Sequence, residues 1–221
     1  MLPYFQPLAL GRARKPFSHR DWLFEIKWDG FRSVVRIEHG KGRLISRNGN
    51  EFKSFSSVNE AIAAELGAHT TILDGEIVCL DADGRPQFRD LLFRKGEPRF
   101  MAFDLLWLDG KDLRYLSLSE RKLELRRILP KSSERLLYCD HIEGDGEALF
   151  RLVCEKDLEG IVAKEKFAPY QTATRWLKIR NQSYSQWAGR EELFERERSD
   201  DPDMRVWSGC VQACVVAADE P

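Results

Sequence analysis

Glu25-Ile-Lys-Trp-Asp-Gly-Phe-Arg32 is the stretch around which the rest of the chain is organised. Apolar residues at 22–24 and 26 precede Lys27, which places this lysine at or near the end of a buried strand. Asp29-Gly30 predicts a tight turn, because glycine adopts backbone angles that other residues avoid, and a second strand-like run begins at Arg32. A lysine among apolar side chains and near other cations loses part of its preference for the charged form, which favours a nucleophilic amine. A hairpin with solvated charges is the alternative interpretation.

The composition is that of a folded, intracellular protein. The chain has 221 residues, 43% of them apolar, which is enough for one large domain or one domain with a small appendage. Its 35 Lys and Arg nearly balance its 36 Asp and Glu, so the net charge does not indicate a strongly basic nucleic-acid-binding domain. A local basic cleft is still compatible with this balance. Five scattered Cys favour reduced thiols over a disulfide framework. No signal peptide or membrane-length apolar run is present, so we expect a cytoplasmic protein without membrane contact.

The apolar periodicity predicts a mixture of short strands and helices. Residues 1–20 are expected to be an extended lead-in that lies across the domain. Three strands are expected within 21–47, and further strands over 70–80, 100–108, 136–139, 158–164 and 175–179. Helices are expected over 58–66, 88–92, 119–129 and 147–156, the third with apolar positions at Leu123, Leu125 and Ile128. Residues 182–221 are expected to form two helices packed on the domain, where Cys210 and Cys214 fit core packing better than metal ligation.

Charged residues recur at the ends of the predicted strands. Glu76 follows Asp74-Gly75, and Glu159 begins an apolar strand that Lys164 closes; each carboxylate is either solvated or aimed into a site. Lys178 and Arg180 alternate along a strand, so they share one face about 7 Å apart. Like charges so placed repel unless an anion lies between them, although an edge strand protected by charges has the same pattern.

Several of these segments resemble known motifs. Lys-Trp-Asp-Gly-Phe-Arg over 27–32 resembles the Lys-x-Asp-Gly-x-Arg motif shared by ATP-dependent DNA ligases, RNA ligases and mRNA capping enzymes. Further ligase-like segments include 46–49, 74–76, 100–106, 159–162 and 177–180, in the same order as in that family. The closest likeness is to the adenylation domain of bacterial ATP-dependent ligases of the end-joining type. The resemblance implies an α+β, ATP-grasp-like fold over residues 1–181, with two mostly antiparallel sheets around a nucleotide cleft and helices outside.

The resemblance also implies how ATP is bound. Lys27 attacks the α-phosphate and carries AMP as a phosphoramide. Phe103 stacks on adenine, and Glu25 helps to recognise the adenine amino group. Lys178 and Arg180 contact the α-phosphate, with an arginine where the family has a second lysine.

Metal and DNA contacts are implied as well. Glu76 binds ribose or metal and Glu159 supports the catalytic Mg²⁺, an ion that takes few carboxylates and keeps waters. Arg47 helps to bind the 5′-phosphate of nicked or broken double-stranded DNA in repair. Arg32 and Lys164 are further candidates for the nucleotide site.

The likeness ends after residue 181. Ligases continue there into an oligonucleotide-binding barrel, and no strand series or final basic motif of that barrel follows here. We therefore expect an adenylation that is slow without a partner protein supplying an oligonucleotide-binding or end-binding function, and association with the nucleoid if the source is bacterial. A non-catalytic module that binds ATP or DNA ends, and an RNA ligase or capping-type enzyme, are the alternatives. NAD is not expected, because only 26 residues precede Lys27.

Overall fold

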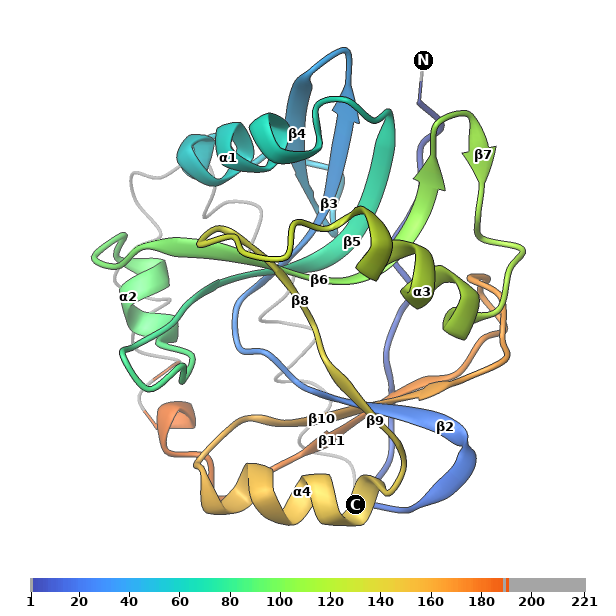
Figure 1. Cartoon of the computed structure of the whole chain (residues 1–221). Helices are drawn as coiled ribbons and strands as arrows, with labels where there is room; N and C mark the ends of the chain where they lie inside the picture. The colour runs from blue at the N-terminus through green and yellow to red at the C-terminus, as the bar shows by residue number, and fades with distance from the viewer. Residues whose placement is uncertain (1, 189, 191–221) are drawn as a thin grey trace.

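Two β-sheets face each other in the computed structural model, which describes residues 2–188 and 190 (Figure 1). Most strand pairs are antiparallel, and helices flank both sheets. The expected α+β class with two mostly antiparallel sheets is therefore confirmed. The predicted C-terminal helices, with Cys210 and Cys214, lie outside the described residues apart from a short 3-10 turn at Ser185–Trp187.

The first sheet, called sheet A, has five strands. Their order is β1 (Gly11–Arg12), β11 (Trp176–Arg180), β10 (Gly160–Glu165), β2 (His19–Ile26) and β9 (His141–Gly144). The second, sheet B, has the order β4 (Lys41–Ser46), β3 (Phe31–Glu38), β5 (Thr71–Cys79), β6 (Pro98–Leu108) and β7 (Lys111–Asp112). Its sixth strand, β8 (Leu136–Tyr138), pairs in parallel with β6.

The link between β2 and β3 differs from the predicted turn. These consecutive strands belong to different sheets, so residues 27–30 cross from one sheet to the other instead of closing a hairpin. Gly30 does not have a positive φ, so the prediction that this glycine adopts a backbone angle closed to other residues is wrong. A Cβ at this position would lie 2.0 Å from the carbonyl oxygen of Ile77, and glycine is needed for that close approach.

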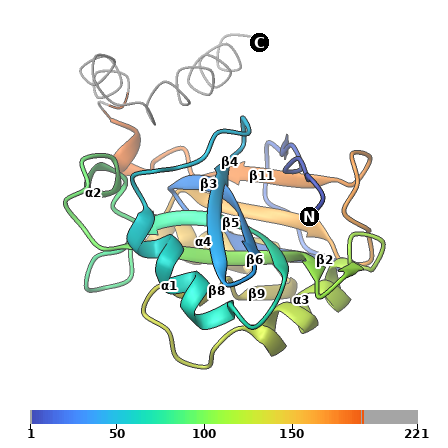
Figure 2. The ribbon, with the colours of Figure 1, turned by 90° about the horizontal axis from the view of Figure 1, so that it is seen from above.

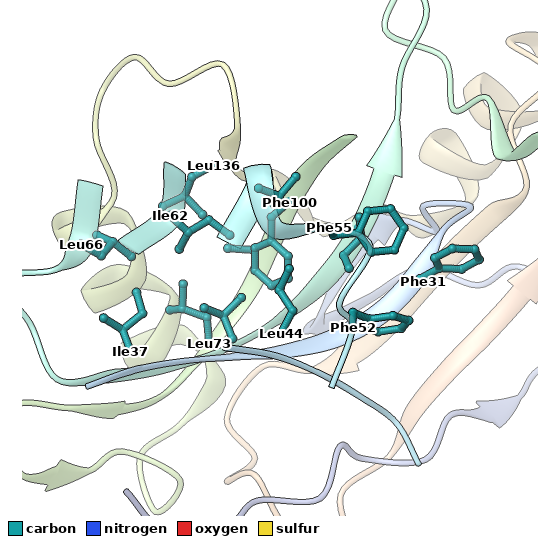
Figure 3. Close-up of a cluster of buried hydrophobic side chains, with 14 of the residues drawn as sticks. Phe31, Ile37, Leu44, Phe52, Phe55, Ile62, Leu66, Leu73, Phe100 and Leu136 are labelled. Atoms are coloured by element: carbon teal, nitrogen blue, oxygen red, sulfur yellow. The ribbon is translucent and has the colours of Figure 1, made fainter. Parts of the chain in front are cut away.

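Four helices flank the two sheets in the described part of the chain. Three of them, α1 (Ser56–Leu66), α2 (Phe88–Leu92) and α3 (Leu118–Ile128), pack on sheet B, and α4 (Gly146–Glu155) packs on sheet A. Figure 3 shows the cluster under α1, where Ile62 lies over Leu73 and Leu66 lies over Ile37 of the sheet. The rings of Phe31 and Phe52 stack at 6.0 Å in the same cluster. Burial of these side chains removes apolar area from water, which is the main stabilising term of the fold.

Helix α3 buries charges that its apolar pattern does not predict. Leu125 is buried as expected, but Leu123 is 70% exposed. Arg121 and Lys122 occupy buried positions instead. Both side chains reach into the space between the sheets, and Arg121 makes a bidentate contact with Asp104 at 2.8 Å for each nitrogen. The core between the sheets is thus partly ionic.

The N-terminal lead-in lies across the domain as predicted. Its side chains Leu2, Phe5 and Leu8 are buried in the cluster between the two sheets. Arg36 of β3 donates hydrogen bonds to the backbone oxygens of residues 2 and 3 at 2.7 Å, which fixes the start of this segment. None of the helices in the described residues is long and apolar enough to cross a membrane.

Candidate active site between the two sheets

Lys27 lies directly after β2, at the point where the chain leaves sheet A. Its backbone N–H donates to the carbonyl oxygen of Gly160 at 2.9 Å, so β10 fixes its position. Gly160 has φ +150°, and a Cβ there would lie 2.2 Å from a carbonyl oxygen of β11, which only glycine avoids. The Nζ atom of Lys27 lies 2.5 Å from Oε2 of Glu159. The structure therefore joins the predicted nucleophile to a carboxylate 132 residues away in sequence.

Burial shapes the charge of both candidate metal carboxylates. Burial raises the pKa of Glu159, although the Lys27 ammonium opposes this change. Burial also raises the pKa of Glu76 to about 8, against the lowering effect of Lys27 and Arg32 and with support from the negative charge of Glu159. Glu76 is thus within electrostatic reach of Lys27 and Glu159, and its role as a metal ligand stays a prediction. Strongly perturbed carboxyls in one cluster are typical of functional sites.

Glu25 is held in a buried box of two lysines. Lys122 Nζ donates to Oε1 of Glu25 at 2.6 Å, and Lys164 Nζ lies 2.6 Å from Oε2. Burial favours a neutral carboxyl, but the two ammonium groups outweigh it and lower the pKa of Glu25. Lys122 also donates to the backbone oxygens of Cys139 and Phe103, at 3.1 and 3.3 Å. The sequence prediction included Glu25 and Lys164 but missed Lys122, which ties Glu25 to α3.

Phe103 packs against the apolar cluster between the sheets and also lies beside these charges. The Lys164 ammonium is 4.1 Å from the centre of the Phe103 ring and 3.9 Å from the Trp176 ring. The Arg32 guanidinium lies 5.3 Å from the Phe103 ring. A cation over an aromatic face is attracted by the ring electrons. The half-buried ring is available for base stacking, which remains a prediction.

Arg32 has a structural role in this arrangement. Its guanidinium makes two hydrogen bonds to buried Asp74, at 3.1 and 2.7 Å. It also donates to the backbone oxygen of Leu8 at 2.8 Å, and the Tyr170 hydroxyl donates to the same carboxylate at 2.7 Å. Arg32 therefore ties the lead-in to sheet B, and its predicted contact with the nucleotide stays a prediction.

The remaining cations lie along the same face of sheet A and at the edge of sheet B. Lys178 is opposite Val162 of β10, which is opposite Glu25, so all three share the face that looks toward sheet B. Arg180 is on this face two residues further, and its guanidinium lies 4.7 Å from the Trp187 ring. Arg47 is exposed in the turn that follows β4. Its predicted contact with a DNA 5′-phosphate stays a prediction.

A segment beyond β11 closes one end of the site. The hydroxyl of Tyr184 donates to Oδ2 of Asp29 at 2.9 Å, and Arg190 binds the same oxygen. Gln186 accepts the backbone N–H of Phe88 at 3.1 Å, and the guanidinium of Arg190 lies over the Phe88 ring at 4.2 Å. Residues 184–188 and 190, called the strap, thus connect the end of sheet A to the crossing loop (residues 27–30) and to α2 beside sheet B. Nothing in the sequence pattern predicted this contact.

The protein side chains at this site can supply part of the coordination shell of a magnesium ion, but not all of it. In the described residues, no group of three or more His, Cys, Asp or Glu side chains could hold a metal. Glu76 and Glu159 are two carboxylates of raised pKa beside Lys27, and a neighbouring cation would relieve the burial of their negative charge. Mg²⁺ binds through one or two carboxylates, substrate phosphates and water. The residues present therefore fit such an ion together with a bound triphosphate.

Comparison with known proteins points to one family. The family model described as "ATP dependent DNA ligase domain" matches residues 9–180. A "Multifunctional non-homologous end joining protein LigD" of Mycolicibacterium smegmatis is 36% identical over 176 residues, which cover 77% of this chain and 23% of that protein. The "SPbeta prophage-derived DNA ligase-like protein LigB" of Bacillus subtilis is 29% identical over 192 residues, covering 83% of this chain and 70% of that protein. The chain thus spans less than a quarter of the first of these relatives.

Solved structures agree with the sequence match. The structure described as "mycobacterial DNA ligase D complexed with ATP and MES" superposes with a TM-score of 0.70 at 32% identity, covering 80% of this chain and 60% of that one. A Chlorella virus DNA ligase-adenylate shares the fold, with a TM-score of 0.58 at 17% identity.

Proposed function

This chain belongs to the ATP-dependent DNA ligase domain family, and from that premise we propose that Lys27 forms a covalent adenylate and passes AMP to a 5′-phosphate end of DNA. The observation that carries the proposal is the position of Lys27 Nζ, 2.5 Å from buried Glu159. A lysine of this kind is a poor nucleophile until it loses a proton, and Glu159 is placed to receive it.

The adenylation step follows from this pair. The neutral Nζ atom attacks the α-phosphorus of ATP, a P–N bond forms, and the P–O bond to pyrophosphate breaks. The ammonium first passes one proton to Oε2 of Glu159, whose raised pKa favours its uptake, and the attacking nitrogen loses a second proton to water as the phosphoramide forms. Lys178 and Arg180, on the same face of sheet A, bind the phosphate oxygens and offset their charge.

Mg²⁺ is the metal that we assign to this site. Glu76 would hold it together with the phosphates of ATP, as would Glu159 before it takes up the proton of Lys27, and the ion would supply charge neutralisation at the triphosphate when bound. Glu76 must lose its proton to act as a ligand, so metal binding is coupled to proton release from this carboxyl.

Adenine recognition falls to the box around Glu25. Phe103 offers one ring face for stacking, and a carboxylate of lowered pKa is a hydrogen-bond acceptor suited to the adenine amino group. Lys122 and Lys164 keep Glu25 ionised and fixed in direction. They are positioning residues for this acceptor.

Transfer to DNA completes the proposed reaction. An oxygen of the DNA 5′-phosphate attacks the phosphorus of the adenylate, the P–N bond breaks, and Lys27 is released as an amine. A DNA 3′-hydroxyl then attacks the activated 5′-phosphate, and AMP leaves as the phosphodiester bond forms. Arg47 is proposed to hold the 5′-phosphate. A partner that supplies an oligonucleotide-binding or end-binding function is part of the proposal.

The test is a covalent-labelling experiment. The purified chain is incubated with α-labelled ATP and Mg²⁺, and the products are separated on a denaturing gel. We expect an acid-labile labelled band that is lost in Lys27→Ala and kept in the control Lys156→Ala, whose lysine is exposed just after α4. Label that persists in Lys27→Ala would contradict the assignment of the nucleophile. Transfer of AMP to RNA ends in preference to DNA ends would replace the DNA substrate with RNA.

A further inference from the structure

The N-terminal tract Arg12–Lys15 concentrates positive charge beside the site. Residues 1–20 contain Arg12, Arg14, Lys15 and Arg20 but no Asp or Glu, in a chain whose basic and acidic residues number 35 and 36. Arg12, Arg14 and Lys15 are exposed. Within the described part of the chain, no carboxylate lies within ion-pair distance of Arg14 or Lys15. The positive charges of Arg14 and Lys15 are therefore directed to solvent.

The backbone of the tract is fixed at both ends. Leu8 is buried before it, and the Phe17 ring after it packs edge-on against Trp22 at 5.1 Å. Gly11 and Arg12 pair with β11, and the N–H of Ala13 donates to the backbone oxygen of Lys178 at 3.1 Å. The cationic side chains are thus carried on an ordered edge of sheet A, beside β11 in Figure 2. Binding at this edge does not require the backbone to become ordered first.

The direction of the tract leads toward Lys27. Arg12 is opposite Lys178, and because the two strands are parallel their side chains share a face. From Arg12 the chain runs in the direction of Arg180, which is opposite Gly160 at the end of β10. The carbonyl of Gly160 holds the N–H of Lys27. A row of positive charge therefore extends from the tract along β11 to the candidate nucleophile.

We propose that Arg12, Arg14 and Lys15 bind backbone phosphates of the duplex DNA that flanks the end held at Lys27. This inference rests on the proposed function, and it adds a surface outside the Lys27 site that binds the DNA duplex. Arg12 ends the strand, and Arg14 and Lys15 lie in a bend directly after it, so the three side chains start from adjacent backbone positions. The phosphates of one DNA strand recur about every 3.4 Å along the helix axis, so neighbouring phosphates suit such a cluster of cations. The phosphates of a nucleotide bound at Lys27 would lie inside the site. The phosphate backbone of a DNA duplex, in contrast, would continue along the edge of sheet A.

Fluorescence anisotropy with a nicked, 5′-phosphorylated DNA duplex tests the inference. The full chain, the double variant Arg14→Gln/Lys15→Gln and the matched control Arg151→Gln/Lys156→Gln are titrated at several salt concentrations. The control removes two exposed cations from α4 and its end, so it changes the net charge equally. We expect the tract variant to bind roughly tenfold more weakly at low salt and to lose about 2 from the slope of log affinity against log salt. The control should stay within about twofold of the unmodified chain, as expected for a charge that touches no phosphate.

Two outcomes would overturn the inference. The first is a tract variant whose affinity and salt slope equal those of the unmodified chain, or fall no more than those of the control. The second is tighter binding of the unmodified chain to a nicked RNA duplex of the same sequence than to DNA. Labelling of the unmodified chain with α-labelled ATP is measured in parallel. Absence of label would refute adenylation at Lys27 by this chain alone, without a partner, and would leave the binding result to decide the role of the tract.

Discussion

Replacing Lys122 with methionine removes a buried ammonium and keeps most of the volume of its side chain. The lost contacts are those to Glu25 at 2.6 Å, to the Cys139 oxygen at 3.1 Å and to the Phe103 oxygen at 3.3 Å. Removing one partner of a buried ion pair costs about 3–5 kcal/mol, because the other charge remains without compensation. Lys164 still contacts the second oxygen of Glu25, so we expect the lower end, about 3 kcal/mol.

Urea denaturation monitored by circular dichroism measures this loss of unfolding free energy, and thermal denaturation measures the matching fall in melting temperature. About 3 kcal/mol corresponds to a fall in melting temperature of roughly 6–12 °C for a domain of this size. Arg127→Met is the matched control, since this arginine is on the same helix and its exposed pair with Glu124 should contribute less than about 1 kcal/mol. The ATP concentration needed for half-maximal labelling should also rise in Lys122→Met, because Glu25 is no longer fixed.

A double-mutant cycle decides whether the loss comes from the Glu25 contact. Glu25→Gln in the Lys122→Met background should cost at least about 1 kcal/mol less than the same change in the unmodified chain, since the pair is already broken. A loss below about 1 kcal/mol in Lys122→Met alone, or additive losses in the cycle, would refute the account of the buried box.

Three further changes test other parts of the site. The pKa of Glu76, raised from 4.5 to about 8, means that the folded chain keeps a proton that the unfolded chain releases, so stability should fall by up to about 1.4 kcal/mol per pH unit from pH 4.5 to 8. Glu76→Gln should flatten this decline in urea denaturation at pH 5 and pH 8, and an unchanged slope would count against the raised pKa. Gly160→Ala should destabilise the domain by more than about 2 kcal/mol and abolish labelling of Lys27, because no space exists for the added carbon; a stable, fully labelled variant would argue against the geometry. Tyr184→Phe should cost about 1–2 kcal/mol, because it removes a hydrogen bond to buried Asp29, and a melting temperature unchanged within error would mean that the strap does not hold the crossing loop.

Local periodicity was enough to predict part of the site. The apolar run before Lys27 identified the end of a buried strand, and the strand has that position. Alternation along 176–180 put Lys178 and Arg180 on one face, which the register with β10 confirms. In both cases the information lies within a few neighbouring residues, because the period of a strand is fixed by backbone geometry.

Contacts between distant segments could not be predicted in this way. Lys122 meets Glu25 across 97 residues, and a lysine that directly follows Glu120 and Arg121 on a helix resembles a solvated one. A weak signal existed, since Leu118, Lys122 and Leu125 have the spacing of one helical face. The crossing from β2 to β3 gave no such signal, because a short link with Asp-Gly suits a hairpin as well as a change of sheet.

The ionic core between the sheets restricts how this sequence can change over generations. Glu25, Lys122 and Lys164 form one buried group, and Asp104 with Arg121 forms another. Loss of one member strands a charge at a cost of several kcal/mol, whereas joint replacement of a whole group by well-packed apolar residues is often tolerated. Accessible mutational routes at these positions therefore pass through simultaneous exchanges, which are rare, while exposed cations such as Arg151 can be exchanged one at a time. Divergence within such a lineage should accumulate on exposed helix surfaces such as that of α4 long before it reaches the charged interior.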